Sequence, residues 1–139
     1  MQMFSRLFEL IDRVRPSETA SAHCDLPCGV YDPAQARIEA ESVKAIAEKY
    51  QENDDPVFRE RAVMIKEQRA DLVKHHRWVL WTDYFKPEHA KKYPEIHDHF
   101  CQATKLAGEA KHSVDPVKGQ ELLDAIEKID KIFWETKEA

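Results

Sequence analysis

Two cysteines and a histidine lie close together near the beginning of the chain, in a short stretch from residue 23 to residue 33. Three residues separate the two cysteines, and the histidine directly precedes the first of them. Thiolates and an imidazole together favour soft or borderline metal ions. The stretch therefore predicts a compact metal-binding hook, and it consists of His23, Cys24, Asp25, Leu26, Pro27, Cys28, Gly29, Val30, Tyr31, Asp32 and Pro33.

The spacing of these residues disfavours the commoner metal sites. Cys24 and Cys28 form C-x-x-x-C, whereas zinc knuckles and thioredoxin-like motifs use C-x-x-C. No second cysteine–histidine pair follows at zinc-finger distance, so a closed structural zinc site is poorly supported. An iron–sulfur arrangement would require a cysteine where Tyr31 stands. An isolated C-x-x-x-C also occurs in tails that bind nothing or form a short-loop disulfide, and the motif by itself leaves that alternative open.

Residues 1–22 precede the hook and can be interpreted in two ways. Their apolar side chains recur at helical spacing but are interrupted by charges, which argues against a secretory signal. A short helix or a tail is one interpretation. The other follows from Ala20-Ser21-Ala22, a small-x-small sequence typical of a cleavage site, and makes residues 1–22 a pro-segment that is removed before His23.

Cleavage after Ala22 would change the donors that the hook offers. His23 would gain a free amine in addition to its imidazole, and Cys24 would offer a backbone nitrogen and a thiolate. With the thiolate of Cys28, these groups make a planar set of two nitrogens and two sulfurs, which suits Ni(II) or Cu(II). The imidazole of His23 could then occupy the axial position.

The composition sets limits on the rest of the molecule. A length of 139 residues suits one domain, and 3 glycines argue against a turn-rich all-β fold. A net charge of −5 gives no basic surface for nucleic acid. No apolar run is long enough to cross a membrane. Three cysteines, an odd number, fit a reducing compartment, so we expect a cytoplasmic protein.

Four amphipathic segments follow the hook, over residues 33–50, 56–85, 94–111 and from 116 to near the C-terminus. Their short polar connections favour antiparallel neighbours, so residues 34–139 are predicted to form an up-down antiparallel four-helix bundle in an all-α fold. The stripes predicted to face the core are Glu39, Val43, Ile46 and Tyr50 in the first segment; Phe58, Ala62, Ile65, Arg69, Leu72, His76 and Val79 in the second; Ile96, Phe100, Ala103, Ala107 and Ala110 in the third; and Leu122, Ile126, Ile129 and Phe133 in the fourth.

Two charged residues lie on these apolar stripes. Glu39 and Arg69 would each be costly to bury without a partner. We expect them to pair with each other or with a polar group at the hook, although either charge could instead reach water at the edge of the bundle.

The whole hook resembles the nickel-binding hook of the nickel superoxide dismutases, whose pattern is H-C-x-x-P-C-G-x-Y-D-P. Every fixed position of that pattern is present in residues 23–33. The segments 83–87, 92–95 and 129–136 also resemble that family, so the similarity extends from His23 to the C-terminus. Removal of residues 1–22 would leave 139 − 22 = 117 residues, a length typical of the mature enzymes.

The resemblance implies a function and an assembly. It implies that superoxide is converted to O2 and H2O2 by nickel cycling between +2 and +3, with one nickel ion per subunit of a homohexamer. It also implies a processing protease that exposes His23. The bundle residues would supply the scaffold for that chemistry.

The resemblance further implies roles for particular residues. His23, Cys24 and Cys28 would be the nickel ligands, and Tyr31 would lie beside the open axial face. Asp25 would orient the loop or Tyr31. Two further residues would support the imidazole of His23 from behind, namely Glu39 and Arg69, and Lys86 is a candidate for attracting the anionic substrate.

Two hypotheses from other classes compete with the dismutase. The chain could hold nickel or copper without turnover, or it could be a helical interaction protein with an incidental C-x-x-x-C. A weak metal set is formed by His75, His76, His97 and His99, and Cys101 is expected to be a thiol on the helix surface or in the core. Trp78, Trp81 and Trp134 are expected to serve packing or subunit contacts.

Overall fold

The computed structural model describes residues 29–138, and these residues are helical with no strand. The four long helices are α2 (Ala34–Glu52), α3 (Pro56–Val79), α5 (Ile96–His112) and α6 (Pro116–Glu138). A π-helical turn, η1 (Leu80–Tyr84), and a short helix, α4 (Pro87–Lys92), connect α3 to α5. Among the described helices, none has a stretch both long and apolar enough to span a lipid bilayer.

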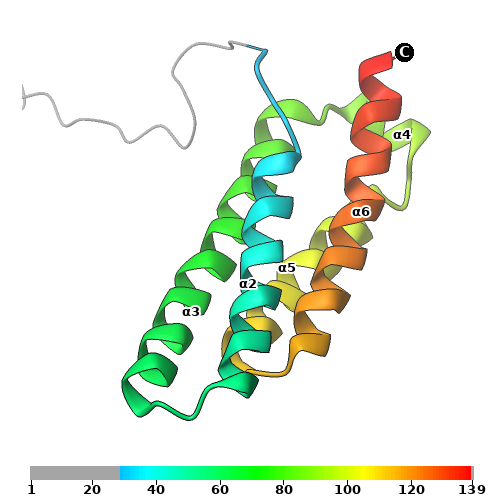
Figure 1. Cartoon of the computed structure of the whole chain (residues 1–139). Coiled ribbons are helices and arrows are strands. Elements are labelled where there is room, and N and C mark those ends of the chain that lie inside the picture. The colour runs from blue at the N-terminus through cyan, green and yellow to red at the C-terminus, as the bar shows by residue number, and fades with distance from the viewer. Residues whose placement is uncertain (1–28, 139) are drawn as a thin grey trace, which may run out of the picture.

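The long helices form a closed ring in which each packs against two neighbours. α2 contacts α3 and α6, and α5 contacts the same two helices from the opposite side. Successive long helices run in opposite directions (Figure 1), so the predicted up-down bundle is confirmed. The start of α2, η1, α4 and the end of α6 lie at one end of the bundle, the upper end in Figure 1. The chain enters from the hook at this end.

Proline and aspartate together fix where two of the helices begin. The Asp55 side chain accepts hydrogen bonds from the first backbone N–H groups of α3, and Pro56 occupies the first helical position. Asp115 accepts from the Val117 N–H in the same way before α6. These contacts satisfy N–H groups that a helix start leaves without partners. The starts predicted for the second and fourth segments, at residues 56 and 116, are therefore confirmed.

The apolar stripes predicted for the third and fourth segments form the core. Every residue of both stripes is buried, from Ile96 to Ala110 on α5 and from Leu122 to Phe133 on α6. They pack with Val43 and Val73 toward one end and with Phe85 toward the other. Helical periodicity alone was sufficient to find these two faces.

The stripes predicted for the first two segments were partly wrong: Val43, Ala62 and Val79 are buried as predicted, but most of the other members lie beside the buried face. The buried face of α2 consists of Ala36, Ala40, Val43 and Ala47, whereas Glu39, Ile46 and Tyr50 are half-buried at its edge. On α3, Ile65 is 38% exposed although it was predicted to face the core. On α2 the reason is that small residues occupy the line of closest helix contact and larger residues flank that line.

The buried face of α3 also carries two long cationic side chains that the sequence analysis missed. Lys66 is 1% exposed, and its Nζ donates to the carbonyl oxygens of Ala110 and Lys111. Those carbonyls belong to the last turn of α5, where no further helical N–H is available. Burial lowers the pKa of Lys66. The side chain thus closes one helix end from a neighbouring helix.

The second predicted segment ended differently from the expectation. It was predicted as one helix to Phe85, but α3 gives way to η1, in which the Phe85 N–H donates to the Leu80 carbonyl at 2.9 Å. The wider turn changes the direction of the following side chains relative to a continuous α-helix. Leu80 enters the core, and Tyr84 lies at the end of the bundle where α2 begins. The short helix α4 was not predicted.

Candidate metal centre

The hook begins just outside the part of the chain that the structure describes. His23, Cys24, Asp25 and Cys28 lie outside residues 29–138, so their predicted roles stay predictions. Chemically, the donor set fits nickel, because two thiolates with nitrogen donors favour a planar nickel or copper site. Within the described residues, no group of three histidine, cysteine, aspartate or glutamate side chains is arranged to hold a metal ion.

The end of the hook is fixed to the bundle by a turn and a cap. Gly29 has φ of +71°, a left-handed conformation that favours glycine. A Cβ at this position would meet nothing within 4 Å, so backbone conformation and not space requires the glycine. Asp32 then accepts the backbone N–H of Ala34 at 2.8 Å, and Pro33 is buried. The backbone from Gly29 to the start of α2, which follows the predicted ligand Cys28, is therefore fixed by these contacts.

Tyr31 packs against a second tyrosine at the same end of the bundle. Its ring lies 5.6 Å from the ring of Tyr84, with 56° between the two planes. Tyr84 in turn packs on Phe133, with ring centroids 4.4 Å apart, and its hydroxyl pairs with Thr136 at 2.8 Å. The sequence analysis had assigned a role to Tyr31 alone, although Tyr84 lies in a segment that resembles the family.

A cavity of about 360 Å³ opens beside the two tyrosines. Lys86 lies on its wall, which agrees with the expectation of positive charge near the hook. Lys137 of α6, which was not predicted, also lies on this wall. Its Nζ is 5.5 Å from the centre of the Tyr84 ring. The lining residues come from four separate parts of the chain and are Gly29, Tyr31, Asp83, Tyr84, Lys86, His89 and Lys137.

Glu39 and Arg69 meet between α2 and α3, so the predicted pairing is confirmed. Arg69 Nη1 donates to both carboxylate oxygens of Glu39, at 3.1 and 3.3 Å. The Glu39 side chain is 16% exposed and that of Arg69 is 38% exposed. The pair thus lies at the edge of the bundle with its more buried member, Glu39, on the first helix after the hook.

A second ion pair lies deeper and was not predicted. Arg77 on α3 is fully buried, and its Nη2 donates to Asp130 of α6 at 2.8 Å. Burial lowers the pKa of Arg77 and raises the pKa of Asp130, and each partner's charge opposes the shift. A carboxylate between Ile129 and Ile132 is the sequence signal that could have indicated this pair, because a charge in a buried stripe needs a partner.

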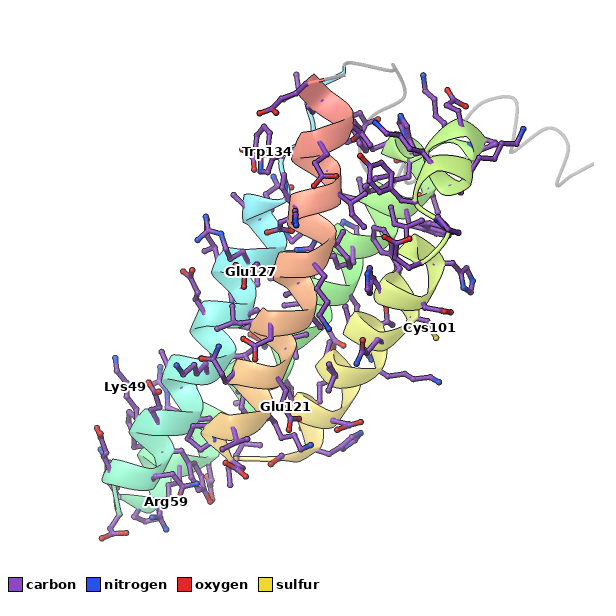
Figure 2. The ribbon with its side chains drawn as sticks, turned by 90° about the vertical axis from the view of Figure 1, so that its right-hand side faces the viewer. Lys49, Arg59, Cys101, Glu121, Glu127 and Trp134 are labelled. Carbon is purple, nitrogen blue, oxygen red and sulfur yellow. The ribbon has the colours of Figure 1, made fainter. Side chains whose placement is uncertain are left out.

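Cys101 and the three tryptophans do not line this cavity. Cys101 is an exposed free thiol on the outer side of α5 (Figure 2), as expected for an ordinary surface cysteine. Trp78 and Trp134 are 54% and 48% exposed, and Figure 2 shows Trp134 projecting outward from α6. Trp81 is half-buried against Phe100.

Comparison with known proteins extends over nearly the whole chain. The chain is 63% identical over 137 residues to the nickel superoxide dismutase of Streptomyces coelicolor and 62% identical to that of Streptomyces seoulensis. Each match covers 99% of this chain and 100% of the relative. A solved native nickel superoxide dismutase superposes with a TM-score of 0.82 at 66% identity, over 84% of this chain and 100% of that one.

Three further solved structures of these enzymes carry single substitutions of a histidine, an aspartate or a tyrosine. In those chains the aspartate lies two positions after the histidine, and the tyrosine lies eight positions after it. The family model for the nickel-containing superoxide dismutases matches residues 18–137. The chain therefore belongs to the family of nickel-containing superoxide dismutases.

Proposed function

We propose that the protein, once cut between Ala22 and His23, converts superoxide to O2 and H2O2 at one nickel ion per subunit held by His23, Cys24 and Cys28. The observation that carries this proposal is the complete hook pattern in a chain that matches the family from residue 18 to residue 137. When bound, nickel supplies one-electron transfer between the +2 and +3 states, with the overall reaction 2 O2⁻ + 2 H⁺ → O2 + H2O2.

Cleavage before His23 is the step that would complete the ligand set. An uncut chain offers an amide nitrogen at His23, whereas a cut chain offers a basic amine. The lengths of the relatives support this step. The two Streptomyces sequences align with 99% of this chain, whereas the solved native enzyme aligns with 84% of it and is itself covered completely. Of 139 residues, 84% is about 117, the length that remains after residues 1–22 are removed.

Tyr31 would act beside the nickel ion, and Asp25 would orient the loop or Tyr31. The spacings support this assignment, because Asp25 lies 25 − 23 = 2 positions and Tyr31 lies 31 − 23 = 8 positions after His23, as in the substituted enzymes. The ring contact of Tyr31 with Tyr84 would limit how far the Tyr31 side chain can move. A tyrosine held in this way can order water or a small anion in the neighbouring cavity.

Glu39 and Arg69 would orient the imidazole of His23 from behind. Metal-ligating histidines commonly donate their second ring N–H to a carboxylate, which fixes the ring and raises its basicity. Glu39 is suitable because it is mostly buried and already holds one cation, Arg69. Arg69 would hold the carboxylate in place through its two hydrogen bonds.

The subunit is further proposed to assemble as a homohexamer in the cytoplasm after a processing protease has acted. Large apolar side chains on the outside of the bundle support an assembly, because a monomer rarely exposes many of them. The exposed members among the described residues include Ile38, Val57, Met64, Trp78 and Trp134. The odd number of cysteines and the absence of a secretory pattern in residues 1–22 support the compartment.

The experiment that tests the function uses the chain that begins at His23. Loaded with nickel, it is expected to bind one ion per chain and to remove superoxide catalytically in a stopped-flow assay. The same chain loaded with zinc is the control, since zinc has no redox chemistry. Stoichiometric nickel without turnover would support a metal-holding protein instead.

A further inference from the structure

The ring of His89 is held in one orientation at the wall of the cavity beside Tyr31. The Lys86 backbone N–H donates to His89 Nδ1 at 3.2 Å. The backbone N–H of His89 donates in return to the Lys86 carbonyl at 3.0 Å. One face of the ring stacks on Tyr84, 5.7 Å between centroids at 26°, and Phe85 meets it edge-on at 5.8 Å. Hydrogen bonds and aromatic contacts thus restrain the ring together.

The partner of Nδ1 settles which ring nitrogen carries the proton. A backbone N–H is always a donor, so Nδ1 must accept and cannot itself be protonated while this bond exists. In the neutral ring the single N–H is therefore at Nε2. Within the described part of the chain no acceptor is paired with Nε2. His89 lines the cavity that Tyr31 and Tyr84 also line, so the ring brings one fixed N–H donor to it.

Tyr84 cannot supply such a donor. The Thr136 hydroxyl donates its only proton to the Phe133 carbonyl at 2.6 Å. The hydrogen bond between the Tyr84 and Thr136 hydroxyls, 2.8 Å long, must therefore use the proton of Tyr84. Tyr84 is left with lone pairs alone, and these repel an anion.

The charged residues of the cavity attract an anion without orienting it. Lys86 and Lys137 bring positive charge on long flexible side chains, and Asp83 brings one negative charge. Asp83 also accepts the hydroxyl proton of Thr82. A small anion drawn in by the lysines would need a rigid donor to fix its direction, and the donor that the backbone holds rigid is His89.

We propose that His89 binds the substrate directly, with its Nε2–H donating a hydrogen bond to superoxide or to the peroxide product beside Tyr31. No proton is transferred, and no bond other than the hydrogen bond forms or breaks. This inference rests on the proposed function, because that function supplies the anion. It assigns to a residue of α4 a role in the direction from which the substrate approaches.

Two substitutions separate this role from a structural one. His89→Asn retains an acceptor near the position of Nδ1 for the Lys86 N–H and removes the donor at Nε2. His89→Gln places an amide N–H near the position of Nε2. With azide as the anionic probe of the nickel-loaded enzyme, the inhibition constant of H89N is expected to rise about tenfold, as for a lost hydrogen bond to a charged group. H89Q is expected to recover most of that loss, with nickel content and thermal unfolding unchanged in both.

A measurement without nickel tests the same inference independently of activity. In protein labelled with ¹⁵N-histidine, the His89 side chain is expected to show the Nε2–H form, and azide is expected to shift the Nε2 signal. An Nδ1–H form, or no shift of the His89 Nε2 signal when azide is added, would overturn the proposal. An inactive wild-type enzyme would instead contradict the proposed function, while the NMR result would still decide the role of His89.

Discussion

At the scale of single residues, the thiolates of Cys24 and Cys28 are proposed to set the electronic properties of the nickel site. Anionic thiolates stabilise the higher oxidation state of a bound metal, and nearby groups then adjust the ligands. All three proposed side-chain ligands lie within six consecutive residues, from His23 to Cys28. The metal site is therefore local in the sequence, whereas Glu39, Tyr84 and His89 reach the same end of the molecule through the fold.

Replacing either hook cysteine is expected to abolish both nickel binding and turnover. Serine has no thiolate, so Cys24→Ser and Cys28→Ser each lose one of the two sulfur donors. Nickel per chain and the rate of superoxide decay measure the effect. Cys101→Ser is the matched control, because this thiol is exposed on α5, and it should retain full nickel content. A hook variant that still turns over superoxide with nickel would contradict the ligand assignment.

Glu39→Gln is expected to lower activity far more than it lowers stability. A lost carboxylate partner of a ligating histidine typically costs about 10–100-fold in activity or metal affinity. A partly exposed ion pair contributes only about 0–1 kcal/mol to the free energy of unfolding. Glu41→Gln is the control, since Glu41 pairs with Arg37 in an exposed position on the same helix. Equal activities of the two variants would argue against the role of Glu39.

At the scale of elements, the distances between helices depend on small residues. Gly119 of α6 lies so close to α2 that an added Cβ would come within 2.7 Å of the Lys44 Cα. This approach keeps α2 and α6 at a fixed distance from each other. Gly108 of α5 has no such constraint, because its Cβ would meet the flexible end of Lys74 at 3.5 Å.

The two glycines are expected to respond oppositely to alanine. Gly119→Ala should lower the free energy of unfolding by about 1–3 kcal/mol, the usual cost of overpacking. Gly108→Ala should raise it by up to about 1 kcal/mol, because alanine favours helix over glycine. Urea unfolding followed by circular dichroism measures both. Similar changes in the two variants would show that the close approach of α6 to Lys44 does not constrain the bundle.

The Arg77–Asp130 pair connects α3 to α6 inside the bundle. Arg77→Met would leave Asp130 without its partner and is expected to lower the free energy of unfolding by about 3–5 kcal/mol. Adding Asp130→Leu should recover most of that loss, because a well-packed apolar pair can replace a buried ion pair. The unfolding transitions of the single and double variants test this. A double variant as unstable as the single one would assign the loss to packing alone.

For the molecule as a whole, the sequence predicted the four long helices, their antiparallel order and the Glu39–Arg69 pair. These follow from periodicity, from proline and aspartate at helix starts, and from the cost of an unpaired charge. The buried Arg77 and the ring orientation of His89 were not predictable in the same way. The burial of Arg77 depends on the alignment of α3 with α6, which brings it to Asp130, 53 residues later in the chain. The orientation of the His89 ring depends on η1 and α4, which no periodic pattern indicates.

A cut before His23 is expected to convert the latent hook into an active nickel site. The most direct measurement compares two nickel-treated samples, the verified uncut chain of 139 residues and the chain that begins at His23. Mass spectrometry confirms each N-terminus, and pulse radiolysis gives the rate of superoxide decay. Catalysis is expected from the chain that begins at His23 and not from the uncut chain. Full activity of the uncut chain, or none in the chain that begins at His23, would contradict the account.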